Sequence, residues 1–318
     1  EYPTTDGEIA GNPLFTNGQP TDGWFRVYFN DFHGNRGHND VFDADSGRWG
    51  QPGQFLLDCR YNHFHGVSGD EHMDLGGDAY IASNIFERAS KDEWTSDTGY
   101  SSAISSGDRG VGTTIIVARN LFSALDHAIN LKANTGTIFE HNTVADFTAD
   151  YTYEGISFGT PFTQDVRCAP INVFIPEDGT NPTVGDGGYL GFNLISNVPR
   201  LVSGADSRKV EGNVVHDLTT KVEFYHNLLN QIADVQIGAN HPGGIFAAAY
   251  AVNIAAVPDF VAPAQGDFSL KMGSAAKGTA IGGIDYGWTV PEWTYILEGP
   301  PAQTPSTTAN FVIGGPGI

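Results

Sequence analysis

The chain has 318 residues, and its 16 Lys and Arg stand against 37 Asp and Glu, which gives a formal net charge of -21. A surface this acidic repels nucleic acids and anionic membranes, and the chain contains no run of about 18 apolar residues that could enter a bilayer. The 40 Gly, 20 Phe and 12 Tyr predict an all-β chain with many tight turns.

One six-residue template recurs seven times along the chain, each time around an asparagine. The seven asparagines are Asn30, Asn62, Asn84, Asn120, Asn142, Asn193 and Asn227. In every copy the residue three positions before the Asn and the residue two positions after it are apolar, whereas the residues between them vary. A strand with one buried and one solvated face produces this alternation. Because such units bury their apolar face only by stacking, we predict a right-handed parallel β-helix, an all-β solenoid.

We expect each Asn to lie in a turn, because Asn tolerates left-handed backbone geometry, and we expect its amide to hydrogen-bond the Asn of the next coil. Two intervals of 22 residues predict bare coils, and the longer intervals predict coils with inserted loops. A second strand is expected after the turns, at Met73 and Leu75, Ile104 and Ser106, Ile129 and Leu131, and Ile156 and Phe158.

Residues 1–290 are expected to form the β-helix, with a long loop insertion at 160–187 and a poorly registered stretch at 198–222. The sequence at 260–278 resembles the closing, capping segment of secreted bacterial β-helix proteins. Residues 291–318 resemble a linker and the start of a β-sandwich module. We therefore interpret the chain as part of a larger extracellular or cell-surface protein with neighbouring domains. Cys59 and Cys168 allow one disulfide, and the sequence leaves their pairing open.

Acidic residues and histidines gather between Asn30 and Asp78, where five of the ten histidines lie. Asp70 and Asp74 form a pair of oxygen ligands four residues apart, and Asp126 and Asn130 repeat that spacing. Converging oxygens of this kind suit Ca²⁺, although an Asp at a turn also caps backbone N–H groups without any metal.

The histidines at His63 and His65 flank the inward-facing Phe64, so both imidazoles project outward side by side. Two such imidazoles can share a metal ion, and the alternative is a pair of ordinary surface residues.

The stretch from Asp70 to Leu75, followed by Asn84-Ile-Phe86 and Lys91, resembles the pectate lyases. In that family an acidic pair holds calcium, the calcium bridges the substrate carboxylate, and the Lys contacts the substrate. The resemblance implies that Asp70 and Asp74 bind calcium and that Lys91 contacts substrate. The family's catalytic Arg-x-Pro-x-x-Arg motif does not occur in this sequence. The base for β-elimination would then come from another residue, for which Lys132, His127, Arg88 and Arg109 are the candidates.

Ile129-Asn-Leu131-Lys132 also resembles the strand that carries the Lys base in β-helical alginate and chondroitin lyases. We therefore treat Lys132, Lys91 and His127 as candidate catalytic residues, and Asp70, Asp74 and Asp126 as candidate calcium ligands. The candidate substrate-binding residues are Arg88, Arg109, Asn130 and Glu154. The signature motifs of the polygalacturonases are absent from the sequence, which argues against a hydrolase of that type.

Three functions follow from this sequence. The first is an extracellular polysaccharide lyase, in which calcium assists β-elimination. The second is a carbohydrate-binding module without catalysis, for which the aromatic residues Tyr28, Tyr80, Trp94, Tyr189 and Tyr225 would supply stacking platforms. The third is a structural or adhesive stalk of a large surface protein. A β-helix alone does not choose among them, because fold does not specify function.

Overall fold

The computed structural model describes the chain over fifteen ranges. These are residues 9–10, 23–34, 40–44, 55–67, 71–75, 77–91, 101–106, 113–132, 135–157, 159–173, 187–203, 208–211, 214–217, 222–234 and 253–288. Asp70, Trp94 and Arg109, all of which the sequence analysis proposed for a site, lie outside these ranges.

Three parallel sheets make up most of the described chain. Sheet A consists of β1 (Ile9–Ala10), β4 (Phe42–Ala44), β7 (Glu71–Leu75), β10 (Ser102–Ser106), β13 (His127–Leu131), β18 (Ala169–Val173) and β21 (Val202–Ser203). Sheet B consists of β2 (Gly23–Tyr28), β5 (Phe55–Arg60), β8 (Ala79–Ala82), β11 (Thr113–Ala118), β14 (Thr135–Glu140), β19 (Gly187–Gly191) and β24 (Val222–Tyr225). Sheet C consists of β3 (Asp31–His33), β6 (His63–Val67), β9 (Ile85–Ala89), β12 (Leu121–Ser123), β15 (Thr143–Ala145), β20 (Leu194–Arg200), β25 (Leu228–Asp234) and β26 (Ile254–Ala255).

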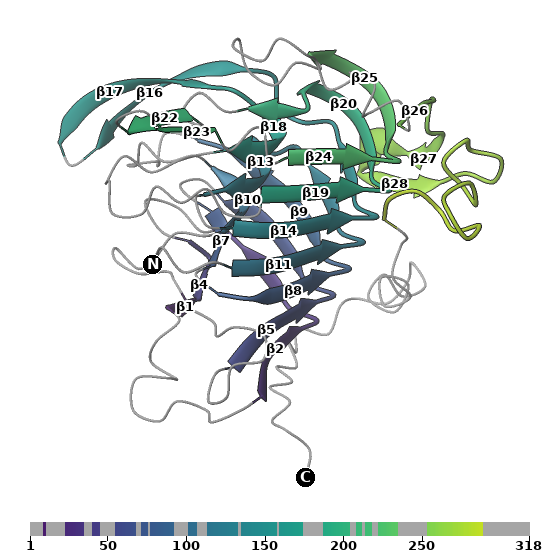
Figure 1. Ribbon diagram of the computed structural model, residues 1–318, viewed down its shortest axis with the longest axis horizontal. Helices are drawn as coiled ribbons and strands as arrows, with labels where there is room; N and C mark the ends of the chain where they lie inside the picture. Colours follow the sequence, from purple (N-terminus) through teal and green to yellow (C-terminus); the bar gives the residue numbers. More distant parts are fainter. Residues whose placement is uncertain are drawn as a thin grey trace.

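From β1 to β25 the chain visits the sheets in a fixed order, from B to C to A and back to B, and each circuit adds one strand to each sheet. Figure 1 shows the result, with the strands of sheet B stacked from β2 at the lower end to β24 near the upper end. The predicted parallel β-helix is therefore confirmed.

The predicted asparagine ladder is confirmed as well, and it runs through the turn between sheets B and C. The side-chain amide of each Asn donates to the amide oxygen of the Asn in the next coil, over distances of 2.9 to 3.2 Å. The backbone N–H of each Asn donates to that same oxygen at 2.8 to 2.9 Å. Asn253 forms an eighth rung that the template did not predict, because Ala255 stands two positions after it instead of a large apolar residue.

The expected left-handed geometry of these asparagines is wrong. The residue before each of the seven predicted asparagines has the positive φ, between 52° and 59°. These residues are Phe29, Tyr61, Ser83, Arg119, His141, Phe192 and His226. The Asn itself is held by its neighbours in the ladder, so the preceding residue makes the sharp bend and directs its own side chain away from the ladder.

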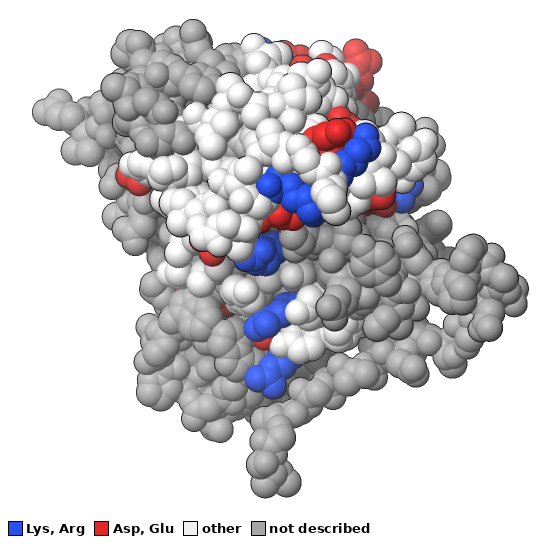
Figure 2. Space-filling view, turned by 90° about the vertical axis from the view of Figure 1, so that its right-hand side faces the viewer, with Lys and Arg blue, Asp and Glu red and all other residues white. Residues whose placement is uncertain are grey.

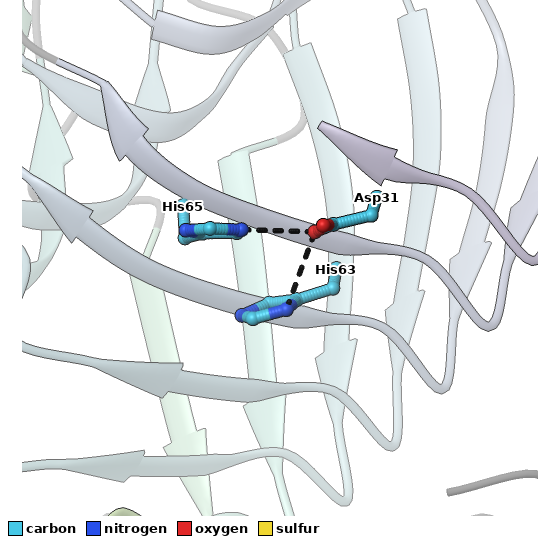
Figure 3. Close-up of side chains that lie close together, drawn as sticks. All are labelled: Asp31, His63 and His65. Atoms are coloured by element: carbon cyan, nitrogen blue, oxygen red, sulfur yellow. Dashed lines mark hydrogen bonds and ion pairs between the residues drawn. The ribbon is translucent and has the colours of Figure 1, made fainter. Parts of the chain in front are cut away.

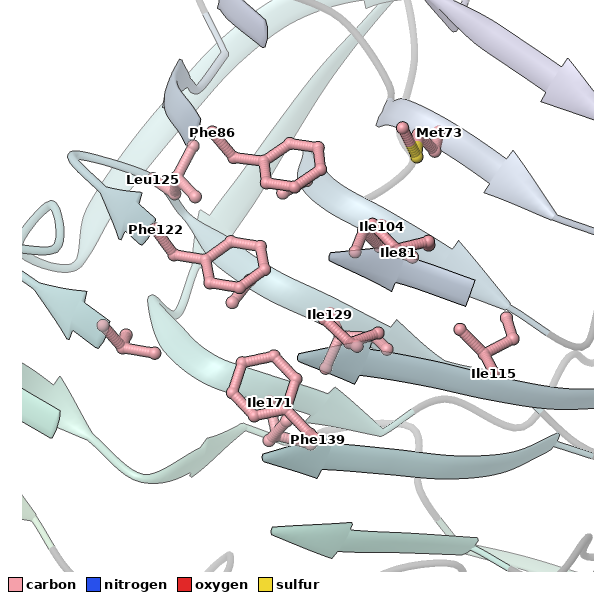
Figure 4. Packing of buried hydrophobic residues seen from close by; sticks show 14 of the residues in the cluster. Met73, Ile81, Phe86, Ile104, Ile115, Phe122, Leu125, Ile129, Phe139 and Ile171 are labelled. Carbon is pink, nitrogen blue, oxygen red and sulfur yellow. The ribbon is translucent and has the colours of Figure 1, made fainter. Parts of the chain in front are cut away.

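Both apolar positions of the template lie in the core. The position before the Asn supplies the inward column of sheet B, from Val27 to Phe224, and the position after it supplies the inward column of sheet C. Four phenylalanines of sheet C stack from coil to coil, with centroid distances of 4.7 Å for Phe32 and Phe64, 4.9 Å for Phe64 and Phe86, and 5.1 Å for Phe86 and Phe122. Figure 4 shows how the rings of this stack pack beside the isoleucines of sheets A and B.

The β16–β17 hairpin (Tyr151–Ser157 and Thr160–Val166) changes two expectations. Ile156 is not a core residue of sheet A, because it lies on this antiparallel hairpin with 60% of its surface exposed. Phe158, its expected partner, lies outside the described residues. The strand that continues sheet A is β18, where Ile171 and Val173 are buried. The expected loop at 160–187 therefore begins as half of a hairpin and then enters the sheet; the hairpin extends from the top of the stack in Figure 1.

A second hairpin, β22–β23 (Arg208–Glu211 and Val214–Asp217), occupies part of the stretch at 198–222. Asn213, which broke the Asn spacing, lies outside the described residues.

After β26, residues 256–288 pack along the outer side of sheet C. This segment contains the β27–β28 hairpin (Phe260–Ala262 and Asp267–Leu270) and one 3₁₀ turn (Pro263–Gln265). Its buried contacts to sheet C join Ala276, Ala280 and Tyr286 to Leu194 and Leu228, and Phe268 and Trp288 to Leu121 and Ala145. Figure 1 shows this segment beside the strand ends at the upper right. The segment thus covers the outer face of sheet C from Ile85 of β9 to Leu228 of β25.

Cys59 and Cys168 are both free and buried, so the disulfide that the sequence allowed is not formed. Burial raises the pKa of both thiols, which keeps them in the protonated form.

We expect Phe86→Ala to lower the free energy of unfolding by about 3–5 kcal/mol, because Phe86 is fully buried between two stacked rings. Phe29→Ala is the matched control: Phe29 is 54% exposed, and its loss should change stability by no more than about 0.5 kcal/mol. Equilibrium urea unfolding measures both variants, and equal losses would contradict the assigned core.

Candidate functional site

A row of polar side chains crosses sheet A. It consists of Asp74, Ser105, Asn130, Asn172 and Ser203, which are register partners on five neighbouring strands. Asn130 donates to the hydroxyl of Ser105 at 3.4 Å and accepts from the amide of Asn172 at 3.1 Å, and Ser203 donates to Asn172 at 3.0 Å. Asn130 is only 2% exposed. The structure thus places this candidate substrate-binding residue within a second hydrogen-bonded ladder.

Lys132 and Asp74 meet at one end of this row, although they are far apart in sequence. The Nζ of Lys132 lies 3.4 Å from Oδ2 of Asp74, and their side chains are 11% and 20% exposed. The contact forms because β7 and β13 flank β10 in sheet A. A carboxylate at this distance stabilises the charged form of an ammonium group.

Lys91 and Asp126 meet in a second cluster, at the base of the β16–β17 hairpin. Tyr151 donates to Oδ2 of Asp126 at 2.7 Å, and its hydroxyl oxygen accepts the backbone N–H of Lys91 at 3.0 Å. The thiol of Cys168 lies 3.6 Å from Oδ1 of Asp126, and the Lys91 ammonium lies 5.9 Å from the ring centroid of Tyr153. These contacts fasten the hairpin to the coils.

Burial raises the pKa of Asp126 to about 7, against which its hydrogen bonds from Tyr151 and Cys168 and the nearby charge of Lys91 act more weakly. Both carboxyl oxygens of Asp126 already accept a hydrogen bond. A group that takes up a proton near neutral pH and has both oxygens engaged is poorly suited to bind calcium, which requires a carboxylate with available oxygens.

His127 is buried completely, and its two ring nitrogens lie 3.1 Å from the carbonyl oxygen of Ser101 and 2.9 Å from that of Arg167. Burial lowers its pKa to about 4, so the ring is neutral at physiological pH and donates its single N–H to only one of these two carbonyls. These contacts tie β13 to neighbouring main chain and leave no exposed ring atom to take a proton from a substrate.

The remaining candidates lie apart from both clusters. Arg88 lies on β9 of sheet C, where its guanidinium is 3.2 Å from Nδ1 of His65. Glu154 is exposed on β16, opposite Thr163 of the hairpin. The structure therefore brings together Asp74 with Lys132 and Lys91 with Asp126, while Arg88 and Glu154 lie on other elements.

Sheet B carries four tyrosines on its outer side, which we call the tyrosine face. They are Tyr28 of β2, Tyr80 of β8, Tyr189 of β19 and Tyr225 of β24, and all are partly exposed. Each is adjacent in sequence to a member of the buried column of sheet B, so each side chain points outward. Tyr189 and Tyr225 stack with their centroids 5.6 Å apart.

Two residues that the sequence analysis did not single out arrange these rings. The Arg60 guanidinium lies 5.9 Å from the ring centroid of Tyr28 and 4.6 Å from that of Tyr80, so it links the two rings. The ring of Tyr189 lies across Gly191, where an added Cβ would stand 2.7 Å from a ring carbon. Gly191 is the register partner of Tyr225. Because Gly191 has no side chain, the ring of Tyr189 can lie over it, flat on the sheet and next to Tyr225.

The charge on the neighbouring side of the molecule differs from the acidic average of the chain. Figure 2 shows Lys and Arg side chains in a row along the stacking direction, on the side where the strands of sheet B end. Arg60 is the last residue of β5, and Arg119 follows β11 in the turn. A local basic row of this kind can attract an anionic polymer to a protein whose net charge is negative.

One further group of side chains has the composition of a metal site. Among the residues that the structure describes, Asp31, His63 and His65 place one ligand atom each within 4.8 Å of one another (Figure 3). They lie on β3 and β6, at the part of sheet C that residues 256–288 leave uncovered.

We expect Asp126→Asn to stabilise the protein increasingly as pH rises from about 4 to 7. The pKa of Asp126 is about 7 in the folded protein, above its ordinary value of 3.8. At low pH the carboxyl group is protonated in both the folded and the unfolded protein and costs no stability. As the pH rises toward 7, the unfolded protein ionises first, and this lowers the free energy of unfolding. The gain should be on the order of 2–4 kcal/mol at neutral pH. Melting temperatures across this pH range measure it, with Asp165→Asn on the exposed side of the hairpin as the control. A difference from the unaltered protein that does not change with pH would contradict this assignment.

No protein-family model matches the chain, and no curated protein matches it. Within the described ranges, no helix is long and apolar enough to cross a membrane. The chain is a parallel β-helix, and its function has to be inferred from its own side chains.

Proposed function

We propose that the protein binds a polysaccharide along the tyrosine face of sheet B. The observation that carries this proposal is the placement of four partly exposed tyrosines from four strands on one side of one sheet. An aromatic ring offers a flat apolar surface to the C–H side of a sugar ring, and the tyrosine hydroxyl adds a polar group at its rim. An extracellular or cell-surface location, with neighbouring domains in a longer chain, would suit this function.

The spacing of the tyrosines favours a long, linear ligand. Neighbouring strands lie about 4.8 Å apart, so the six intervals from β2 to β24 span roughly 29 Å. Tyr28 and Tyr80 form one end of this row, and Tyr189 and Tyr225 form the other. Between them lie Ile116 and Ile138, of which Ile138 is 36% exposed. A polymer lying along the stacking direction could contact both ends, whereas a compact small molecule could not.

The basic row beside the tyrosine face suits a polysaccharide with carboxylate groups, which would have to lie on the side away from Glu140 and Glu223, the carboxylates near Tyr189. The basic row of Figure 2 runs beside the tyrosine face in the same direction. The net charge of -21 does not prevent an anionic ligand from binding here, because binding depends on the local electrostatic potential of the surface that the ligand contacts.

We expect Tyr80→Ala and Tyr189→Ala each to weaken polysaccharide binding by about 1 kcal/mol, roughly fivefold in Kd, through loss of a stacked ring. Tyr80→Phe and Tyr189→Phe retain the ring and should retain most of the affinity. Affinity electrophoresis in gels with neutral or uronic-acid polysaccharides measures this, with Ile156→Ala on the hairpin as a surface control.

Gly191→Ala tests the same face without removing an aromatic residue. The added methyl group would displace the ring of Tyr189 and should weaken binding about as much as Tyr189→Ala. If none of these variants changes retention of any bound polymer, the tyrosine face is not the binding surface. If no polymer is retained at all, the structural-stalk alternative replaces the proposal.

A polysaccharide lyase is the second candidate, and the contact between Asp74 and Lys132 favours it. Both residues were proposed from resemblances to lyases, and they meet at 3.4 Å. β-Elimination requires that the charge of the uronate carboxylate be neutralised while a base removes the neighbouring proton. Lys132 could supply that positive charge, the role that the resemblance to pectate lyases gives to calcium, and the neighbouring Asp74 carboxylate would then be the base that takes the proton. For calcium to bind Asp74, the ion would have to replace this ammonium group.

The lyase candidate predicts that uronic-acid polysaccharides incubated with the protein gain the ultraviolet absorbance of an unsaturated uronate. Lys132→Met should abolish the gain, whereas Lys277→Met, at a half-exposed lysine of the segment beside sheet C, should not. A parallel series with calcium and with chelator tests the expected cofactor. A flat trace with a polymer that the protein demonstrably binds would exclude the lyase and leave the binding function.

A further inference from the structure

The first three strands of sheet C present six outward side chains, of which Ile85 packs against residues 256–288. The rows are Asp31 and His33 on β3, His63 and His65 on β6, and Ile85 and Glu87 on β9. They point outward because they flank Phe32, Phe64 and Phe86 of the core stack. Polar and titratable groups thus fill five of these six positions.

The distances at the centre of this group match those around a metal ion. Oδ1 of Asp31 lies 2.9 Å from Nε2 of His65 and 3.5 Å from Nδ1 of His63. Bonds of 2.0 to 2.1 Å in a tetrahedral site place two ligand atoms about 3.3 Å apart. The two histidine nitrogens lie within 4.8 Å of each other, and a small rotation of the partly exposed rings closes that separation. Figure 3 shows both rings directed toward the carboxylate.

The second ring nitrogen of His63 also contacts a carboxylate, that of Glu87, which indicates a site for a cation. Nε2 of His63 lies 2.9 Å from Oε1 of Glu87, and Nδ1 of the same ring lies 3.5 Å from Oδ1 of Asp31, so this ring stands between two carboxylates. Two carboxylates this close together create a negative potential that attracts a cation. A carboxylate bound to the outer nitrogen of a ligating histidine is also a recurrent feature of metal sites.

We propose that Asp31, His63 and His65 bind a divalent transition-metal ion on the outer face of sheet C, with Glu87 orienting His63. Two imidazoles and one carboxylate suit Zn²⁺ and its neighbours in the first transition row rather than Ca²⁺. Three protein ligands leave coordination positions open on the solvent side, for water or for an oxygen atom of another molecule. The Asp31 side chain is 61% exposed, so the ion has an entry path.

Arg88 opposes the ion in the metal-free protein. Its guanidinium donates to Nδ1 of His65, which leaves the ring proton on Nε2, where it is shared with Asp31. Binding of an ion to Nε2 requires that this proton leave and that Arg88 turn away. The side chain of Arg88 is 61% exposed and can do so.

The experiment is a titration of chelator-treated protein with Zn²⁺ by calorimetry and with Co²⁺ by visible absorption. We expect a Co²⁺ spectrum typical of nitrogen and oxygen ligands in a low-symmetry site. His63→Gln and His65→Gln should each abolish it, Glu87→Gln should weaken binding about 10- to 100-fold, and Arg88→Gln should leave binding unchanged or strengthen it. His226→Gln is the matched histidine control, because His226 is the residue before Asn227 at the far end of the stack and stacks on Phe192.

Melting temperatures in chelator separate loss of a ligand from loss of the fold, since the metal-free variants should melt close to the unaltered protein. Unchanged Zn²⁺ affinity in the double variant His63→Gln/His65→Gln would overturn the proposal, because the ion would then bind elsewhere. The absence of binding to the unaltered protein would overturn it as well. The three side chains would then form only hydrogen bonds and ion pairs with one another.

Discussion

The amide ladder between sheets B and C holds the coils in register. Each rung joins a side-chain amide, a backbone N–H and the amide oxygen of the next coil, and the asparagines from Asn62 to Asn227 are fully buried. A buried amide left unpaired would cost several kcal/mol, so a coil shifted by one residue is strongly disfavoured. The ladder also makes the left-handed residue before each Asn tolerable, although such a backbone costs roughly 1–2 kcal/mol.

The coils could be predicted because every rung repeats the same local pattern, whereas the elements between them could not. Residues Tyr151 to Ser157 alternate like a strand of sheet A, but alternation does not say which strand lies alongside, and the chain pairs them with β17. Asn253 was missed for the opposite reason, since it accepts both ladder hydrogen bonds although Ala255, two positions after it, is small. Pairing partners are decided by tertiary packing, which a local pattern does not contain.

The candidate sites show the same division. Asp74 and Lys132 were chosen separately from two resemblances, and only the register of β7, β10 and β13 brings them within 3.4 Å. The neighbours of His63 and His65 could have been found from the ladder itself. Asp31 lies one residue after its ladder Asn, as His63 does, and Glu87 lies three residues after its own, as His65 does. Equal offsets from the rungs place side chains next to each other across the sheet.

The turn row before the asparagines holds Phe, Tyr, Ser, Arg and His side chains on nearly the same backbone, with φ between 52° and 59°. The shape of this turn is therefore imposed by the ladder beneath it and is indifferent to the residue that makes the bend. These turn residues lie about 4.8 Å apart along the stack. Evolution or protein engineering can therefore change their side chains one at a time while the β-helix beneath them keeps its structure.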